Sequence, residues 1–280
     1  MQETLVKKEL KEKAREVIHR TRGASHGPIT RLASPSDFGQ LLKPFVFLDY
    51  FDIDPKRMPP IGFHPHSGIE TVTVVLHGQL SYQETSGTEG VIEEGGVEWM
   101  HAGSGVWHSG VPVGAARIKG YQLWLALPPE QENSGSEARY VDASRFRKNG
   151  PARVILGKYG DAASEVRSLE SVNYLDVVLK KGEKWRYEPP SGHTIAWAAV
   201  HEGEFAAPAI RTGELAVFEE SNGAIEFEAI ENTGFLIGSA VKHPWDLVLG
   251  AYSVHTSRHA LKKGEARIAE IGKRYPFARS

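Results

Sequence analysis

The feature of this sequence that most restricts its fold is a succession of short apolar or alternating runs separated by glycine-rich turns. From Phe45 onward the runs read FVFLDYF, ETVTVVL, QLSYQE, GVEWM and YQLWLALP. Between them lie the turn signals Pro59-Pro60, Ser86-Gly87, Gly95-Gly96 and Gly103-Ser104-Gly105. Short strands at near-regular spacing are typical of a β-sandwich or β-barrel, including jelly rolls. This part of the chain is therefore predicted to be all-β.

The same rhythm returns in the second half of the chain. After a polar stretch over residues 129–152, the runs read ARVILG, YLDVVLKKG, TIAWAAVHEGEF, GELAVFEE, IEFEAI and GFLIGSA. The polar stretch has few large apolar residues, as expected of a linker or crossing loop. We therefore place a domain boundary there and predict a duplicated β-barrel of the jelly-roll type, over residues 1–140 and 141–280.

Both ends of the chain carry partly helical patterns. Residues 3–18 place apolar residues among Lys and Glu, which predicts a short amphipathic helix or an extended N-terminal arm. The interleaved charge indicates an exposed or oligomer-packing face rather than a nucleic-acid contact. Residues 261–275 predict a C-terminal helix, although Gly264 and Gly272 lower its intrinsic propensity.

Composition excludes several classes of site and partner. The 280 residues include 33 Lys and Arg against 35 Asp and Glu, so the chain has no global attraction to nucleic acid. There is no cysteine, so a metal site must use His and carboxylate ligands. The N-terminal residues lack the apolar core of a signal peptide, and no run reaches the roughly 18 apolar residues of a membrane span. We therefore expect a cytoplasmic protein without membrane contact.

One segment concentrates metal-binding residue types. His64, His66 and Glu70 occur in GFHPHSGIETVTV, over residues 62–74, and share one parity. Side chains alternate faces along an extended chain, so all three are expected to point to one side of a sheet. Imidazole and carboxylate ligands suit Fe(II), Mn(II), Ni(II), Cu(II) or Zn(II). Pro65 has no N–H and favours an edge strand, where two partly exposed histidines are the alternative interpretation.

A second segment adds a third imidazole. His108 occurs in GGVEWMHAGSGVWHSG, over residues 95–110, and follows the tight turn at Gly103–Gly105. At this spacing the next strand would bring His108 beside the first two histidines. Three imidazoles and a carboxylate from neighbouring strands would leave room at a metal ion for water or substrate.

These segments closely resemble the pirin family of the cupin superfamily. The motifs HPH-x-G-x-ETVT, G-V-x-W-M-x-AG-x-G-x-x-HS and QLW-x-x-LP occur in this order within residues 45–130. Over residues 150–280 only the looser strand rhythm of the family's second barrel is similar. The resemblance implies two stacked cupin barrels with a non-haem iron site in the first and often no metal in the second. Some bacterial relatives are quercetin 2,3-dioxygenases, and the animal relative is an iron-dependent nuclear co-regulator.

The resemblance also assigns roles to residues. His64 and His66 match the family's HPH ligands, and His108 matches its later histidine ligand. The family's fourth ligand is a glutamate two residues after that histidine, where this sequence has Gly110. Glu70, which pirins retain without normally ligating the metal, or a water molecule would have to fill this position. His101 is a candidate pocket acid or base.

Three functions remain open at this stage. The first is a dioxygenase that binds Fe(II), or else Zn, Ni, Cu or Mn, and acts on a flavonol-like or other aromatic substrate lying against aromatic side chains. The second is a metal- or redox-responsive regulatory protein that binds a protein partner without turnover. The third keeps the fold but has lost the metal, because Gly110 removes a ligand.

Overall fold

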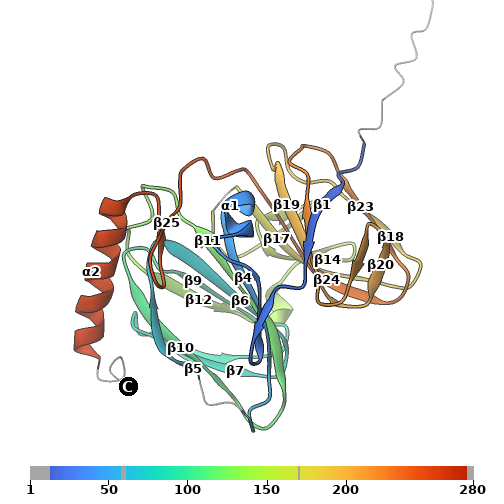
Figure 1. The fold of residues 1–280 in the computed structure, drawn as a ribbon. Helices are drawn as coiled ribbons and strands as arrows, with labels where there is room; N and C mark the ends of the chain where they lie inside the picture. Colours follow the sequence, from blue (N-terminus) through green and yellow to red (C-terminus); the bar gives the residue numbers. More distant parts are fainter. Residues whose placement is uncertain (1–12, 58–60, 170, 276–280) are drawn as a thin grey trace, which may run out of the picture.

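The computed structural model describes residues 13–57, 61–169 and 171–275, and most of their secondary structure is β-strand (Figure 1). The predicted all-β character is confirmed, as is the helix at the C-terminal end. Residues 1–12, which hold most of the predicted amphipathic segment, lie outside the described residues. The last residues of that segment, Val17 and Ile18, begin a strand rather than continuing a helix.

The first half of the chain forms two sheets. The larger has the strand order β12-β9-β6-β11-β4-β3-β2, and the smaller has the order β5-β10-β7-β8. Their bounds are β2 (Ala24–His26), β3 (Ile29–Ala33), β4 (Phe45–Ile53), β5 (Ile61–His66), β6 (Ile69–His77), β7 (Leu80–Glu84), β8 (Glu89–Ile92), β9 (Val97–His101), β10 (Val106–Pro112), β11 (Ile118–Ala126) and β12 (Glu137–Val141).

The second half repeats this plan. Its larger sheet has the order β1-β22-β19-β24-β17-β14-β13, and its smaller sheet has the order β18-β23-β20-β21. Their bounds are β1 (Val17–Thr21), β13 (Lys148–Asn149), β14 (Ala152–Leu156), β17 (Val172–Leu179), β18 (Lys184–Tyr187), β19 (Ile195–Glu202), β20 (Glu204–Ala207), β21 (Ala209–Arg211), β22 (Leu215–Phe218), β23 (Ile225–Ala229) and β24 (Thr233–Ala240).

Short elements complete the chain. They are α1 (Phe38–Leu42), the 3-10 turn η1 (Ala143–Arg145), β15 (Lys158–Tyr159), β16 (Ala162–Ala163), β25 (Val248–Leu249), β26 (Val254–His255) and the long helix α2 (Arg258–Arg274).

Each half is a pair of open sheets rather than a closed barrel, as far as the described residues show. The two sheets of the first half share apolar cores, one of which joins Phe51 of β4 to Leu80 and Tyr82 of β7. Burial between facing sheets, and not hydrogen-bonded closure, therefore holds each half together. The described residues do not show the expected closure into barrels, and the division into two barrel domains stays a prediction.

The two halves share a large core of their own. Val72 and Val74 of β6 pack with Tyr174 and Trp197 from the second half, and all four are almost fully buried. Successive side chains of a strand point to opposite faces, so the residue between these valines points into the first half. Thr73 accordingly lines a cavity inside it. This alternation decides which residues of β6 reach the candidate site.

Each end of the described chain packs against the half of the molecule to which it does not belong in sequence. β1 pairs with β22 of the second half, whereas α2 lies against the first half (Figure 1). The Trp107 indole of β10 donates a hydrogen bond to the Ile268 carbonyl of α2 at 3.0 Å. A Cβ atom on Gly264 would lie 2.5 Å from Oγ of Ser67, so glycine permits the close approach of this helix. The glycines that weaken the helix in isolation thus serve its packing.

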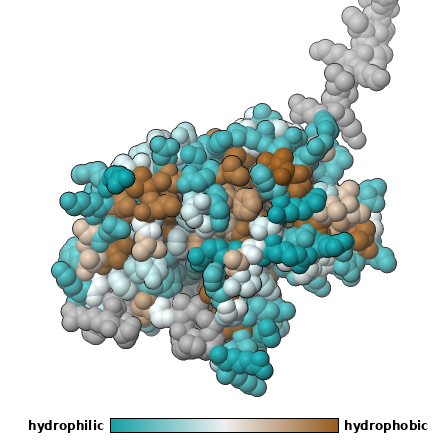
Figure 2. Space-filling model, viewed as in Figure 1, coloured by the Kyte–Doolittle hydropathy of each residue, from teal (hydrophilic) through white to brown (hydrophobic). Residues whose placement is uncertain are grey.

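The surface is mixed. Figure 2 shows hydrophobic patches on one face, separated by hydrophilic side chains. Val241 and Trp245 are among the exposed large hydrophobic residues, and both border a cleft between the halves. Within the described part of the chain, no helix has the length and apolar character to cross a membrane. The cytoplasmic location stays a prediction.

Candidate metal centre

Two neighbouring strands bring the three motif histidines together. β5 and β10 pair in antiparallel register, with His108 opposite His64 and Val106 opposite His66. β5 is an edge strand of its sheet, as expected from Pro65. In an antiparallel pair, opposite residues point to the same face, so this register places the imidazoles together inside the first half.

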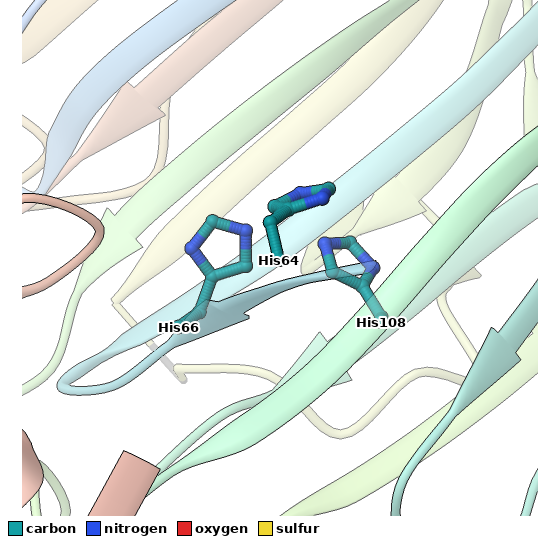
Figure 3. Close-up of side chains that lie close together, drawn as sticks. All are labelled: His64, His66 and His108. Atoms are coloured by element: carbon teal, nitrogen blue, oxygen red, sulfur yellow. The ribbon is translucent and has the colours of Figure 1, made fainter. Parts of the chain in front are cut away.

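The three rings form a compact cluster (Figure 3). The ring centroids of His64 and His108 lie 4.4 Å apart, and that of His66 lies 5.0 Å from each of the other two. One nitrogen from each ring falls within 4.8 Å of the others. His66 and His108 are buried, and His64 is partly exposed. The cluster therefore has one side toward solvent.

Backbone acceptors fix the tautomers of two rings. Nδ1 of His64 lies 3.0 Å from the Gly62 carbonyl, and Nδ1 of His66 lies 3.0 Å from the Tyr252 carbonyl. A carbonyl only accepts, so each Nδ1 carries the proton and each Nε2 keeps its lone pair. Metal-binding histidines have this arrangement, because the outer hydrogen bond orients the ring.

The inward nitrogens are the evidence that the cluster fits a metal ion. Nε2 of His66 and Nε2 of His108 are both buried, and neither has a hydrogen-bond partner among the described residues. A buried polar atom without a partner costs free energy, and a ligated cation would remove this cost. A ligand set of three imidazole nitrogens, with no cysteine thiolate, suits the divalent ions from Fe(II) to Zn(II).

Burial keeps the rings of His64 and His66 neutral. Burial, together with the neighbouring His108, lowers the pKa of His64 to about 4. The same causes hold the pKa of His66 well below its usual range. Metal ions bind the deprotonated form of a ligand, so these rings are ready to bind without releasing protons at neutral pH.

Sequence reasoning missed a buried carboxylate that lies beside this cluster. Oε1 of Glu98 lies 3.9 Å from Nδ1 of His108, and Glu98 is 3% exposed. Oε1 is also buried without a hydrogen-bond partner among the residues described. The alternation of VEWMH could have identified Glu98. Its side chain points to the same face of β9 as that of Met100, into the first half, whereas Trp99 points to the interface between the halves.

Glu70 does not join the cluster, which corrects the prediction made from parity. β5 and β6 belong to different sheets, and the turn between them contains Gly68 with a φ of 75°. The chain changes direction there, so the alternation that relates His64 to His66 does not continue to Glu70. Its carboxylate instead accepts hydrogen bonds from the Trp99 indole, at 3.1 Å, and from the Ser168 hydroxyl of the second half.

His101 also lies away from the three rings. It is directly opposite Glu70 in the pairing of β6 and β9, and its Nδ1 is 3.3 Å from Oε1 of Glu70. Both residues line a cleft between the two halves, which does not include His64, His66 or His108. An acid–base role for His101 at the metal is therefore without geometric support.

Gly110 leaves space beside the cluster. It lines a cavity of about 60 Å³ with His64, Glu98 and His108. Its φ lies outside the left-handed region, and a Cβ there would meet only Leu80, at 3.2 Å or more. A side chain is thus sterically possible at this position, and glycine is not required by the backbone.

Comparisons with known proteins match the chain to one family. A family model described as Pirin matches residues 28–125. A Pseudomonas aeruginosa protein named "putative quercetin 2,3-dioxygenase" is 31% identical over 229 residues, which cover 75% of this chain and 79% of that protein. A Caulobacter vibrioides protein named "Pirin-like protein" is 30% identical over 220 residues, with the same two coverages.

Solved structures agree at the level of the fold. The crystal structure of a quercetin 2,3-dioxygenase from Acinetobacter baumannii aligns with a TM-score of 0.83 at 24% identity, over 93% of this chain and 98% of that one. A bacterial pirin from Escherichia coli, in complex with nickel(II), aligns with a TM-score of 0.63 at 20% identity, over 79% and 95%. With its motifs, its fold and these relatives, the chain belongs to the pirin family.

Proposed function

We propose that this protein is a metal-dependent dioxygenase that holds Fe(II) through His64, His66 and His108 and acts on a flavonol-like or other aromatic substrate. The observation that carries the proposal is the convergence of three imidazoles, of which His66 and His108 each have a buried Nε2 without a hydrogen-bond partner among the described residues. The name of the Pseudomonas relative supports the reaction class.

The choice of metal follows from the ligand set. Three imidazole ligands suit Fe(II), and also Zn(II), Ni(II), Cu(II) and Mn(II). A solved relative in the family was crystallised with nickel(II). With Gly110 in place of a glutamate, the anionic charge nearest the ligands is that of Glu98, across the His108 ring. We therefore expect weaker selectivity for Fe(II) than a site with a carboxylate ligand would have.

Each side chain around the site has a physical task. A bound divalent metal supplies a Lewis acid and a redox centre for dioxygen. Glu98 faces Nδ1 of His108 and favours the tautomer with the proton on that nitrogen. Trp124 lies against His66 with ring centroids 4.8 Å apart and stacks on Phe47 at 4.0 Å. This aromatic pair excludes water from the buried side of the site.

One observation favours the regulatory alternative. The cavity beside His64 and His108 has a volume of about 60 Å³, which suits a few water molecules or dioxygen but not a flavonol. An aromatic substrate would have to approach from the partly exposed side of His64 or displace the cavity wall. A metal-responsive protein that signals to a protein partner would need no such space.

Metal content tests the site. Untagged protein dialysed against Fe(II) under anaerobic conditions should bind one equivalent, measured by elemental analysis. His66→Ala should lose this metal because it removes a buried ligand, whereas His77→Ala should keep it, because His77 is exposed and paired with Glu94. Equal metal content in all three proteins would mean that the cluster is not a metal site.

Dioxygen consumption tests the reaction. Fe(II)-loaded protein mixed with quercetin in air should consume one dioxygen per flavonol, and His66→Ala should not. Full metal loading without flavonol-dependent oxygen uptake would reject the dioxygenase and leave the regulatory function.

A further inference from the structure

A second cluster of polar side chains lies in the cleft between the two halves. This cleft has a volume of about 840 Å³ and is lined by residues from both halves. Ser134, His101 and Glu70 form a chain of contacts along its wall. Nε2 of His101 lies 2.8 Å from Oγ of Ser134, and Nδ1 lies 3.3 Å from Oε1 of Glu70. The metal proposal uses none of these residues.

The direction of these hydrogen bonds follows from chemistry. A carboxylate only accepts, so the proton on a neutral His101 ring lies on Nδ1 and points to Glu70. Nε2 then carries a lone pair, and the Ser134 hydroxyl donates to it. A hydroxyl that donates to an imidazole oriented by a carboxylate is the arrangement that activates a serine nucleophile.

Rigid elements hold the base and its carboxylate. Glu70 and His101 are direct cross-strand partners in the large sheet. Glu70 is 2% exposed, and its second oxygen accepts from the Trp99 indole and the Ser168 hydroxyl. The carboxylate therefore keeps its orientation without help from solvent, as a positioning group requires.

The loop that carries Ser134 is fixed by backbone bonds. The Ser134 N–H donates to the Gln131 carbonyl at 2.9 Å, and the Ser134 carbonyl accepts from the Ser104 N–H at 2.8 Å. Ser104 follows directly on the turn that leaves the strand of His101. Ser134 is itself partly exposed to the cleft. The serine is thus both held against its base and accessible.

A donor for a developing negative charge lies next to the serine. Gly135 lines the cleft, and its backbone N–H donates no hydrogen bond to any residue in the described part of the chain. In several serine hydrolases the N–H of the residue after the nucleophile binds the oxyanion. Gly135 occupies that position in the sequence.

We propose that Ser134, His101 and Glu70 form a hydrolytic site for small carboxylic esters. Oγ of Ser134 attacks the ester carbonyl carbon while its proton passes to Nε2 of His101. The bond from that carbon to the alcohol oxygen then breaks, and His101 returns the proton to the leaving alkoxide. Water attacks the acyl group, gives a proton to His101, and Ser134 leaves with that proton. The sum is ester plus water giving acid plus alcohol, without oxidant or reductant.

The lining of the cleft indicates the kind of ester. It includes the cations Arg167 and Lys242 and the carboxylates Glu130 and Glu137, so it has no single charge preference. The apolar side chains of Leu169, Val241 and Trp245 provide the remaining contact area. A small uncharged ester is the matching probe.

The absence of cysteine allows a direct test of the base. Ser134→Cys introduces the single thiol of the protein. If His101 acts as a base, the thiol should react with iodoacetamide at pH 7 about tenfold faster than an ordinary thiol, whose pKa is near 8.5. Ser171→Cys is the matched control, because Ser171 lines the same cleft but is not a hydrogen-bond partner of the His101 ring among the described residues. Adding His101→Gln should abolish the acceleration, and adding Glu70→Gln should move the pH profile upward.

Ester turnover tests the site as a whole. Metal-free protein should hydrolyse p-nitrophenyl acetate with an initial burst, and a fluorophosphonate should label Ser134, identified by peptide mass spectrometry. Ser134→Ala should lose both properties, whereas Ser171→Ala and His77→Ala should retain them. Equal alkylation rates for the two thiol variants, or hydrolysis unaffected by Ser134→Ala, would reduce the cluster to a structural hydrogen-bond network. Neither result depends on the metal proposal.

Discussion

The carboxylate of Glu98 lies behind the ring of His108, with Oε1 3.9 Å from Nδ1. Both side chains are nearly inaccessible to solvent. A buried carboxylate that faces the outer nitrogen of a ligand orients the ring and raises its basicity. Since Gly110 supplies no carboxylate, Glu98 is the anionic group that lines the small cavity together with His64 and His108.

Replacing this carboxylate should weaken the metal site. Glu98→Gln keeps the shape of the side chain but removes its charge, and we expect the metal affinity to fall about 10- to 100-fold. Competition with a chromogenic chelator measures the change. Glu89→Gln is the control, because Glu89 is exposed on β8. Equal metal affinities for Glu98→Gln and the unmodified protein would show that Glu98 does not contribute to metal binding.

Restoring a carboxylate at position 110 should have the opposite effect. A Cβ at position 110 would meet only the side chain of Leu80, at 3.2 Å or more, and the backbone there needs no glycine conformation. The carboxylate of Gly110→Glu would enter the cavity beside His108 and add negative charge at the metal. We expect tighter Fe(II) binding and a higher preference for Fe(II) over Zn(II), measured by the same competition. Weaker binding with unchanged thermal stability would contradict this geometry.

The contact of α2 with the first half should not tolerate a side chain at position 264. A Cβ on Gly264 would lie 2.5 Å from Oγ of Ser67 and 2.6 Å from Nε2 of His255. Gly264→Ala should therefore destabilise the protein by about 1–3 kcal/mol, although alanine favours helix. Lys263→Ala, at an exposed position of the same helix, should be neutral or stabilising. Urea unfolding of both variants measures the difference, and a stabilised Gly264→Ala would show that α2 packs less closely.

Stability of the metal-free protein should fall as pH decreases from about 6.5 to 4. Burial lowers the pKa of His193 to about 4, and burial followed by the charge of Lys43 does the same for His243. In this window the unfolded chain binds protons that the folded chain does not, so acid favours unfolding. Urea titrations at pH 7.5, 6 and 5 should show falling free energies of unfolding. His193→Gln should reduce the slope, and a free energy independent of pH would contradict these assignments.

The parts of the structure that the sequence predicts are those set by local pattern. Alternation and turns predict the strands. The HPH motif and the turn before His108 match the family pattern and so predict the three histidines, although β5 and β10 are far apart in the sequence. Pairing across the sheets is harder to foresee. Glu70 follows a turn after which the chain enters another sheet. Its odd or even position relative to His64 and His66 therefore no longer shows which way its side chain points. Glu98 reaches His108 only through the facing of two sheets, which no local pattern encodes.

The same limit applies to β1 and to the serine cluster. Val17 begins a strand because it pairs with Phe218 at the edge of β22, about 200 residues further along the sequence. His101 and Ser134 are separated in sequence by β10 and β11, and their contact depends on the Gly103 turn packing against the loop of Ser134. The sequence analysis proposed His101 as an acid or base, but it could not predict that Ser134 and Glu70 are its partners.

The hydrogen bond between Nδ1 of His66 and the Tyr252 carbonyl sets an order of events during synthesis. The first ligands leave the ribosome long before Tyr252, and the helix that packs behind this region follows still later. A nascent chain that carries all three histidines therefore lacks the group that orients His66. The proposed metal site is therefore complete only in a chain that has been synthesised and folded past Tyr252.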